Sequence, residues 1–440
     1  MFKSLHSEFE KKDTDLYKFQ QRKGFSKYIL IRSLDINTLK EIIKDQTGND
    51  AKSSKQDELY KELFDTDITI DKLIEHILKK YPEEREYRLE QEKHLPAIIE
   101  NFGDVKCGIR NDNMNDVAKA LVRDKSILSK KELDRRVNEL LQGTIKGYLL
   151  WQYYNQVTND LIEHIVNDHP SVIPTIRKIH DVDFFLKIND EIVPFDLKIT
   201  HISNDFFDKY TKGIELNIDN KCNITDDYCI NDRSHGELEQ IKNLYKVTKE
   251  KRLPKMTGQS KEDLKNNLTS LGIEEINQEL SALEELKEIK TYYSQIKLKY
   301  DLPNMSKLSQ QGMVDILLKY NQTETEKLLE QLIAKRRTCI KQLETDRKIL
   351  EWWNYKNQGE RLFKNNNRFF VFLAYRNSFE DARPLKGNVD SLKNLISRQL
   401  DAISNGQELN TINYYYDKDK NLKGSYTINA TSVIYASEII

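Results

Sequence analysis

The most informative segment of the sequence is Asp181-Val-Asp-Phe-Phe-Leu-Lys-Ile-Asn-Asp-Glu-Ile-Val-Pro-Phe-Asp-Leu-Lys-Ile-Thr200. Its first apolar run, Phe184 to Ile188, predicts one strand, and Ile192 to Thr200 predicts a second. Between them stand three polar residues that favour a turn, Asn189-Asp190-Glu191. Two apolar runs joined by so short a polar connection predict a β-hairpin.

Charged residues stand at particular points of this hairpin. Asp183 opens the first strand, while Asp196 and Lys198 come late in the second. Because side chains alternate along a strand, Asp196 and Lys198 share one face and Leu197 points to the opposite face, toward the core. Unpaired buried charge is costly, so two carboxylates beside one ammonium group require compensation. A Mg²⁺ ion held by Asp183, Asp196 and the backbone carbonyl of Leu197 would provide it.

Val182-Asp183 followed by Asp196-Leu197-Lys198 resembles the PD-(D/E)xK signature of the restriction-endonuclease-like nuclease superfamily, and Type II restriction endonucleases in particular. Val182 departs from the pattern, since Pro is common there. The resemblance implies a Mg²⁺-dependent endodeoxyribonuclease that leaves 5′-phosphate and 3′-hydroxyl ends. It implies that Asp183 and Asp196 bind the metal and that Lys198 activates or orients the attacking water. The alternative is a surface hairpin with an Asp–Lys ion pair that contributes less than about 1 kcal/mol.

The helix before the hairpin is a second element of this resemblance. In many members of the superfamily that helix carries an acid that assists the metal site. Here the candidates are Glu163 and Gln152. Glu163 lies on the flank of a helix that spans Thr144 to Val166, which also suits an exposed capping or ion-pair role.

The composition limits the remaining interpretations. At 440 residues the chain is expected to form two or three domains. Its 70 Lys and Arg balance 71 Asp and Glu, so any DNA-facing surface must be local. Four scattered cysteines are typical of reduced thiols. The sequence has no long apolar run and its first residues do not resemble a signal peptide, which predicts a cytoplasmic protein without a membrane partner.

The order of elements predicts a split α/β core. Residues 1–142 are expected to form a large helical N-terminal domain that takes part in DNA recognition. Residues 143–204 would form the first part of a restriction-endonuclease-like core with a mixed α+β sheet, and residues 350–440 its second part. Residues 205–349 read as a helical insertion or clamp between them. The apolar run Asn367 to Tyr375 predicts a strand buried on both faces.

A locally basic stretch between Gln331 and Arg368 is the strongest candidate for a DNA-binding surface. Trp352, Trp353 and Tyr355 interleave with its charges, and nucleic-acid surfaces combine cations with aromatic rings in this way. The alternative is that the tryptophans belong to the core. The residues predicted to contact DNA are Arg336, Arg337, Lys341, Arg347, Lys348, Arg361 and Lys364.

These observations favour a Type II restriction enzyme acting on double-stranded DNA. A homodimer is expected because palindromic duplex sites match two-fold symmetry. Two other functions fit the same sequence. One is a partner-activated defence or repair nuclease with the same site. The other is a non-catalytic helical DNA-binding or scaffold protein in which the Asp-Leu-Lys triplet is coincidental.

Overall fold

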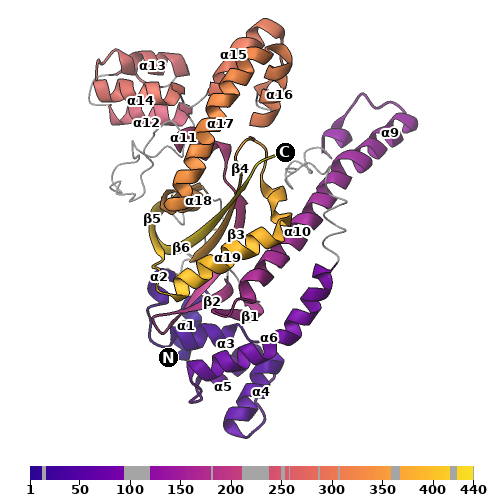
Figure 1. Cartoon of the computed structure of the whole chain (residues 1–440), viewed down its shortest axis with the longest axis vertical. Helices are drawn as coiled ribbons and strands as arrows, with labels where there is room; N and C mark the ends of the chain where they lie inside the picture. The colour runs from indigo at the N-terminus through magenta and orange to yellow at the C-terminus, as the bar shows by residue number, and fades with distance from the viewer. Residues whose placement is uncertain are drawn as a thin grey trace. The chain divides into compact units, whose positions relative to one another are not determined.

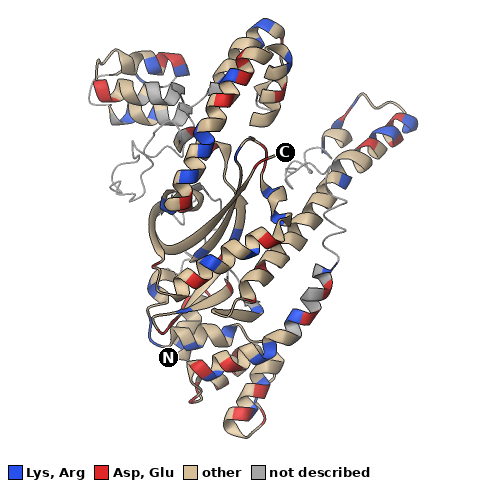
Figure 2. Ribbon diagram, viewed as in Figure 1, with Lys and Arg blue, Asp and Glu red and all other residues tan. Residues whose placement is uncertain are grey.

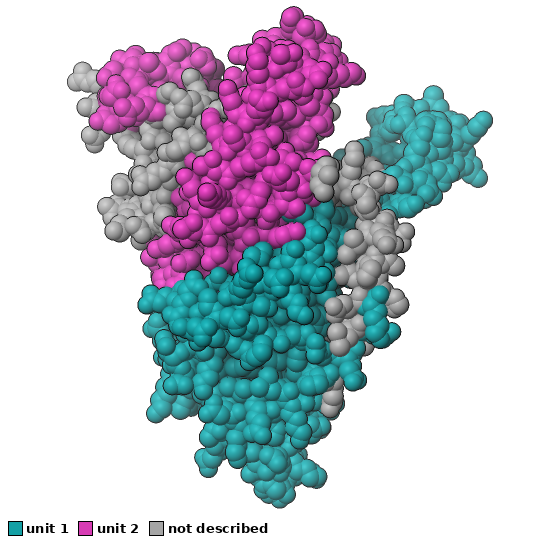
Figure 3. Space-filling model, viewed as in Figure 1, with its two compact units in different colours: residues 1–11, 18–200, 381–408 teal, residues 12–17, 201–380, 409–440 magenta. Residues whose placement is uncertain are grey.

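The computed structural model divides the chain into two compact units. The residues it describes are 1–11, 16–93, 119–179, 182–210, 237–248, 253–256, 258–285, 288–305, 308–357, 367–416 and 424–439. Unit 1 comprises residues 1–11, 18–200 and 381–408, and unit 2 comprises residues 12–17, 201–380 and 409–440 (Figure 3). Each unit therefore gathers segments that are distant in the sequence.

The described N-terminal part of unit 1 is helical, as predicted. Tyr28 lies in a helix and is fully buried. One helix begins where the Asp35 carboxylate accepts the backbone N–H of Thr38 at 2.9 Å, and it ends at Gly48 with a left-handed φ of 71°. The helices here are α1 (Phe2–Phe9), α2 (Leu16–Phe19), α3 (Phe25–Arg32), α4 (Ile36–Thr47), α5 (Gln56–Phe64) and α6 (Ile70–Glu92).

One long helix follows in unit 1. It consists of α9 (Lys130–Leu140), a π-helical turn η1 (Leu141–Ile145) and α10 (Lys146–Asn167), which follow one another without a break (Figure 1). The sequence predicted a helix that begins at Thr144, after Gly143. That prediction was wrong, because the chain passes through the glycine within the π turn. The predicted domain limit at residue 142 thus falls inside a helix.

The second half of the long helix packs into unit 1. Its buried residues include Trp151, Tyr154, Leu161 and Ile162. The 3₁₀ turn η4 (Arg383–Gly387) and helix α19 (Val389–Ser404) contact it.

A buried lysine fixes the 3₁₀ turn to the long helix. Lys386 is 1% exposed, and its Nζ donates to Asn155 Oδ1 at 2.7 Å and to Asn159 Oδ1 at 2.6 Å. The Tyr154 hydroxyl adds a bond to the carbonyl of Pro384 at 2.6 Å. These polar contacts join segments more than two hundred residues apart in the chain.

Three antiparallel strands complete unit 1, and they confirm the predicted hairpin. These are β1 (Val172–Ile179), β2 (Val182–Ile188) and β3 (Glu191–His201). Unit 2 has three more strands, β4 (Arg368–Tyr375), β5 (Asn410–Tyr416) and β6 (Gly424–Ser437). There β6 lies between the other two, parallel to β4 and antiparallel to β5.

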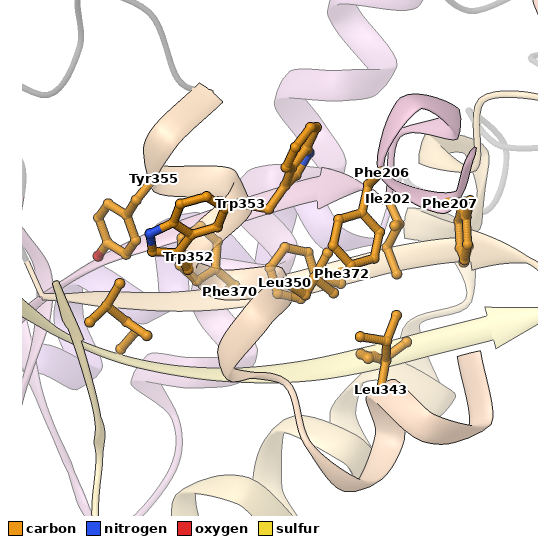
Figure 4. Close-up of a cluster of buried hydrophobic side chains, with 14 of the residues drawn as sticks. Ile202, Phe206, Phe207, Leu343, Leu350, Trp352, Trp353, Tyr355, Phe370 and Phe372 are labelled. Carbon is orange, nitrogen blue, oxygen red and sulfur yellow. The ribbon is translucent and has the colours of Figure 1, made fainter. Parts of the chain in front are cut away.

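Unit 2 is built around the buried strand β4. All eight of its residues are buried, as predicted for a strand covered on both faces. Trp352, Trp353 and Tyr355 pack in the same core as Phe370 and Phe372 (Figure 4). The helices of unit 2 are α11 (Asn204–Tyr210), α12 (Glu237–Val247), α13 (Lys261–Thr269), α14 (Glu274–Glu285), α15 (Glu288–Tyr300), α16 (Gln310–Tyr320), α17 (Gln322–Thr345) and α18 (Lys348–Asn357).

The described residues therefore form a mixed α/β protein with strands of both directions and many helices, which confirms the predicted class. Among the helices described, not one combines the length and the apolar character that crossing a membrane requires.

A carboxylic acid lies in the core of unit 2. Glu351, on α18, is fully buried. Ser432 donates its hydroxyl to Glu351 Oε1 at 2.5 Å, and Asn410 Nδ2 donates to Oε2 at 2.8 Å. Burial raises the pKa of Glu351 to about 7, although both hydrogen bonds act in the opposite direction. The acid links α18 to both β5 and β6.

This burial predicts a pH-dependent stability. The folded state binds the Glu351 proton more tightly than the unfolded state does, so protonation of Glu351 adds to the free energy of unfolding. This contribution is fully present below the unfolded pKa of 4.5 and is lost as pH rises through about 7. We expect Glu351→Gln to remove this decline and to raise the free energy of unfolding above pH 7 by a few kcal/mol, about 1.4 per pKa unit. Urea unfolding across pH measures it. Glu330→Gln, an exposed change on α17, is the control, and equal pH profiles for wild type and Glu351→Gln would contradict the prediction.

Candidate active site on the β2–β3 hairpin

The register of the hairpin is fixed by its turn. Asn189 and Asp190 both adopt positive φ, 49° and 62°, which is the geometry of a two-residue type I′ turn. Ile188 then pairs with Glu191, and the pairing continues to Phe184 opposite Phe195. The turn is thus one residue shorter than predicted, since Glu191 already belongs to β3.

The paired phenylalanines lie on one face of the hairpin, and the pair on the other face, Phe185 and Pro194, is also buried. Phe184 and Phe195 are fully buried, and their rings stack with centroids 5.4 Å apart. Since neighbouring positions point to the other face, Asp183 and Asp196 lie next to this pair on the opposite side. Lys198 is two residues beyond Asp196 and shares its face. All three charged side chains are partly buried.

The carboxylate of Asp183 is bound directly to the second strand. The backbone N–H of Leu197 donates to Asp183 Oδ2 at 2.7 Å. The backbone carbonyl of Asp183 in turn accepts the hydroxyl of Thr175, on β1, at 3.1 Å. Thr175 is 2% exposed. No sequence pattern singled it out, because its role depends only on the pairing of β1 with β2. The structure therefore holds Asp183 against the middle of the Asp196-Leu197-Lys198 triplet.

The donor set at this point suits a hard cation. Carboxylates and backbone carbonyls are the ligands that Mg²⁺ prefers. Two neighbouring carboxylates repel each other, and a cation would relieve that repulsion. Across the described residues no group of three or more His, Cys, Asp or Glu side chains is placed to hold a metal ion. The candidate site therefore rests on Asp183, Asp196 and the Leu197 carbonyl.

Glu163 does not lie on an exposed flank of its helix, as the sequence had suggested. It lies on α10, which packs against β1 and β2, and only 8% of it is exposed. The expected exposure of Glu163 was wrong, because this side of the helix faces the interior of unit 1. Nor does Glu163 join Asp183 and Asp196 in a three-acid group within the described residues.

Arg336 is a second correction, since it lies inside unit 2 and is only 2% exposed. Its Nε donates to the carbonyl of Tyr375 at 2.6 Å and its Nη1 to Asn204 Oδ1 at 2.9 Å. Its guanidinium stacks 3.8 Å from the ring centroid of Phe207. Burial lowers its pKa to about 10. A side chain so enclosed cannot contact DNA phosphate in this fold.

The other predicted DNA contacts divide into three groups. Arg337 and Lys341 are exposed on α17, and Arg337 Nη2 pairs with Glu438 at 2.9 Å. Arg347 and Lys348 are partly buried near the start of α18. Arg361 and Lys364 lie outside the described residues.

The interleaved aromatic residues do not belong to a nucleic-acid surface. Trp352 and Tyr355 are fully buried and Trp353 is 4% exposed, so the interpretation as core residues holds. Among the described residues of the basic stretch, the exposed Lys and Arg lie along α17, where Figure 2 shows their positions in blue.

Comparisons with known proteins add no assignment. Neither the protein-family models, nor the curated proteins, nor the solved structures contain a match to this chain. The function must therefore be argued from the hairpin itself.

The burial of Arg336 predicts a stability effect. Arg336→Met keeps the apolar stem but removes the donors to Tyr375 and Asn204, which should lower the free energy of unfolding by about 3 kcal/mol. Arg337→Met is the matched control, because it removes one surface ion pair and should cost less than about 1 kcal/mol. Urea unfolding compares them. Equal losses would contradict the structural role of Arg336.

Proposed function

We propose that this chain is a Mg²⁺-dependent endodeoxyribonuclease of the restriction-endonuclease-like superfamily, with its active site on the β2–β3 hairpin. The observation that carries the proposal is the 2.7 Å hydrogen bond from the Leu197 N–H to Asp183 Oδ2. It joins the two separated parts of the sequence motif in space. An ordinary surface hairpin has no need to turn a carboxylate inward onto the backbone of the neighbouring strand.

Each residue has a separate part in the proposed reaction. Asp183 and Asp196, with the Leu197 carbonyl, would hold the metal, which when bound supplies a Lewis acid for the phosphate oxygens. The Leu197 amide and Thr175 keep Asp183 in one orientation, which limits the reorganisation needed during the reaction. Lys198 would orient the attacking water and offset the negative charge that develops on the phosphate. A P–O bond forms to that water and the bond to the 3′ oxygen breaks, which leaves a 5′-phosphate and a 3′-hydroxyl.

The proposed substrate is double-stranded DNA, and the proposed biological role is that of a Type II restriction enzyme. The support is the motif together with its geometry. Two cations of α17, Arg337 and Lys341, are exposed. In the proposal they contact the phosphate backbone, and Arg337 exchanges its ion pair with Glu438 for that contact. A two-fold dimer would bring two hairpins to the two strands of a duplex.

The proposal predicts metal-dependent cleavage that is lost on single substitutions. With Mg²⁺ and unmethylated plasmid of varied sequence, we expect wild type to linearise or nick DNA, and EDTA to prevent it. Asp183→Asn, Asp196→Asn and Lys198→Met should each reduce the rate by at least about 10²-fold, since each removes a charge from the site. Agarose gels of time courses measure the rates.

Matched controls lie on the same hairpin. Lys187 pairs with Asp71 at 3.0 Å and with Asp190 at 3.5 Å on an exposed surface, so Lys187→Met and Asp190→Asn should leave cleavage unchanged. Cleavage that persists in the Asp183 and Asp196 variants would overturn the assignment of the site. DNA binding without any cleavage by wild type would favour the non-catalytic DNA-binding or scaffold protein instead.

A further inference from the structure

The first half of the long helix in unit 1 makes few packing contacts with the other described elements. Not one residue of α9 is buried, whereas the later part of α10 is buried along one side. Figure 1 shows α9 continuing α10 away from strands β1 to β3. Most stability of a protein helix comes from packing, so an extended helix without it calls for a partner.

Apolar residues recur every fourth position along this helix. Four of them are largely exposed: Leu133 by 42%, Leu141 by 45%, Leu149 by 58% and Tyr153 by 55%. Two intervening members, Val137 and Ile145, are partly buried. We call these six residues the apolar face of α9–α10. Trp151 and Tyr154, by contrast, are each 4% exposed and belong to the buried side.

The π turn keeps these residues on one side of the helix. In a regular α-helix a spacing of four residues drifts by about 40°, so six such positions would wind about 200° around the axis. The π turn η1, Leu141–Ile145, accommodates one extra residue. It thereby reduces the rotation of these positions around the axis by roughly 100°. The apolar face consequently stays opposite the buried side of α10.

The order of residues on this face is symmetric about Leu141. Leu133 and Leu149 lie eight residues on either side of it, and Val137 and Ile145 lie four residues on either side. A two-fold contact requires residue i of one copy to meet residue j of the other, and j to meet i. Two antiparallel copies crossing at Leu141 would therefore match apolar residues from Leu133 to Leu149, while Tyr153 would lie beyond this segment, opposite Ser129.

Charge supports the same arrangement. Asp134 and Lys146 are both exposed and are about three helical turns apart once the π turn is included, so they share one edge of the apolar face. In the antiparallel pairing Asp134 stands opposite Tyr148 of the second copy, two residues from Lys146. Two-fold symmetry makes this opposite-charge contact twice.

We propose that the apolar face of α9–α10 binds a second copy of this chain, as an antiparallel two-fold helix pair centred on Leu141. A standard stable interface buries about 800 Å² per partner. Six partly exposed side chains provide less, so the dimer should be reversible and depend on concentration. The proposal does not rest on the nuclease assignment, since it concerns the helix and not the hairpin.

The test is sedimentation velocity of the full chain without DNA over about a hundredfold range of concentration. We expect wild type to shift from monomer to dimer. Asp134→Lys and Lys146→Asp should each weaken association about tenfold or more, because each places like charges opposite each other twice. The combined variant restores opposite charges and should regain the wild-type behaviour. Far-UV circular dichroism shows that each variant is folded.

Two further variants locate the contact. Leu141→Asp should abolish the dimer, whereas Leu298→Asp, at a position 92% exposed on α15, should leave it intact. Leu141→Cys should form an intermolecular disulfide on mild oxidation, beyond any that wild type forms, because the two-fold axis brings this position next to itself. Wild type that stays monomeric at every concentration would overturn the proposal. So would failure of the combined variant to recover, or association that requires added duplex DNA.

Discussion

The type I′ turn at Asn189 and Asp190 is the constraint on which the rest of the candidate site depends. Strand side chains alternate with a period of two, so a slip of one residue in the pairing would exchange the two faces of the hairpin. Positive φ at both turn residues sets the pairing of Ile188 with Glu191, and this in turn places Phe184 opposite Phe195. Asp183 then meets the backbone of Leu197 instead of the core.

Several ionisable residues lie in the interior and not on the surface. Arg336 bridges α17 to the end of β4 and to α11, Glu351 links α18 to β5 and β6, and Lys386 holds a 3₁₀ turn on α10. Each has hydrogen-bond partners at short distance, which is the condition for burying such groups at all. A local excess of Lys and Arg in the sequence is for this reason a weak guide to a nucleic-acid surface in this protein.

The long helix connects the two proposed functional elements of unit 1. Its C-terminal half packs against β1 and β2, the strands that orient Asp183, and its N-terminal half carries the apolar face of α9–α10. An association at that face would fix the spacing of two hairpins through a continuous helix. Helices transmit position well because their backbone hydrogen bonds leave little freedom within the element.

The sequence alone determined the hairpin, the buried strand β4 and the mixed α/β class, because alternation and apolar runs are local patterns that survive in the fold. It also selected Asp183, Asp196, Leu197 and Lys198 as a group, since side-chain period and strand spacing follow from the same local geometry. Only the tertiary structure decided the burial of Glu163, Arg336 and the two tryptophans, because burial depends on which distant segments pack over a residue. The sequence likewise did not predict that the helix continues through Gly143, because tertiary context can override a residue's low helix propensity.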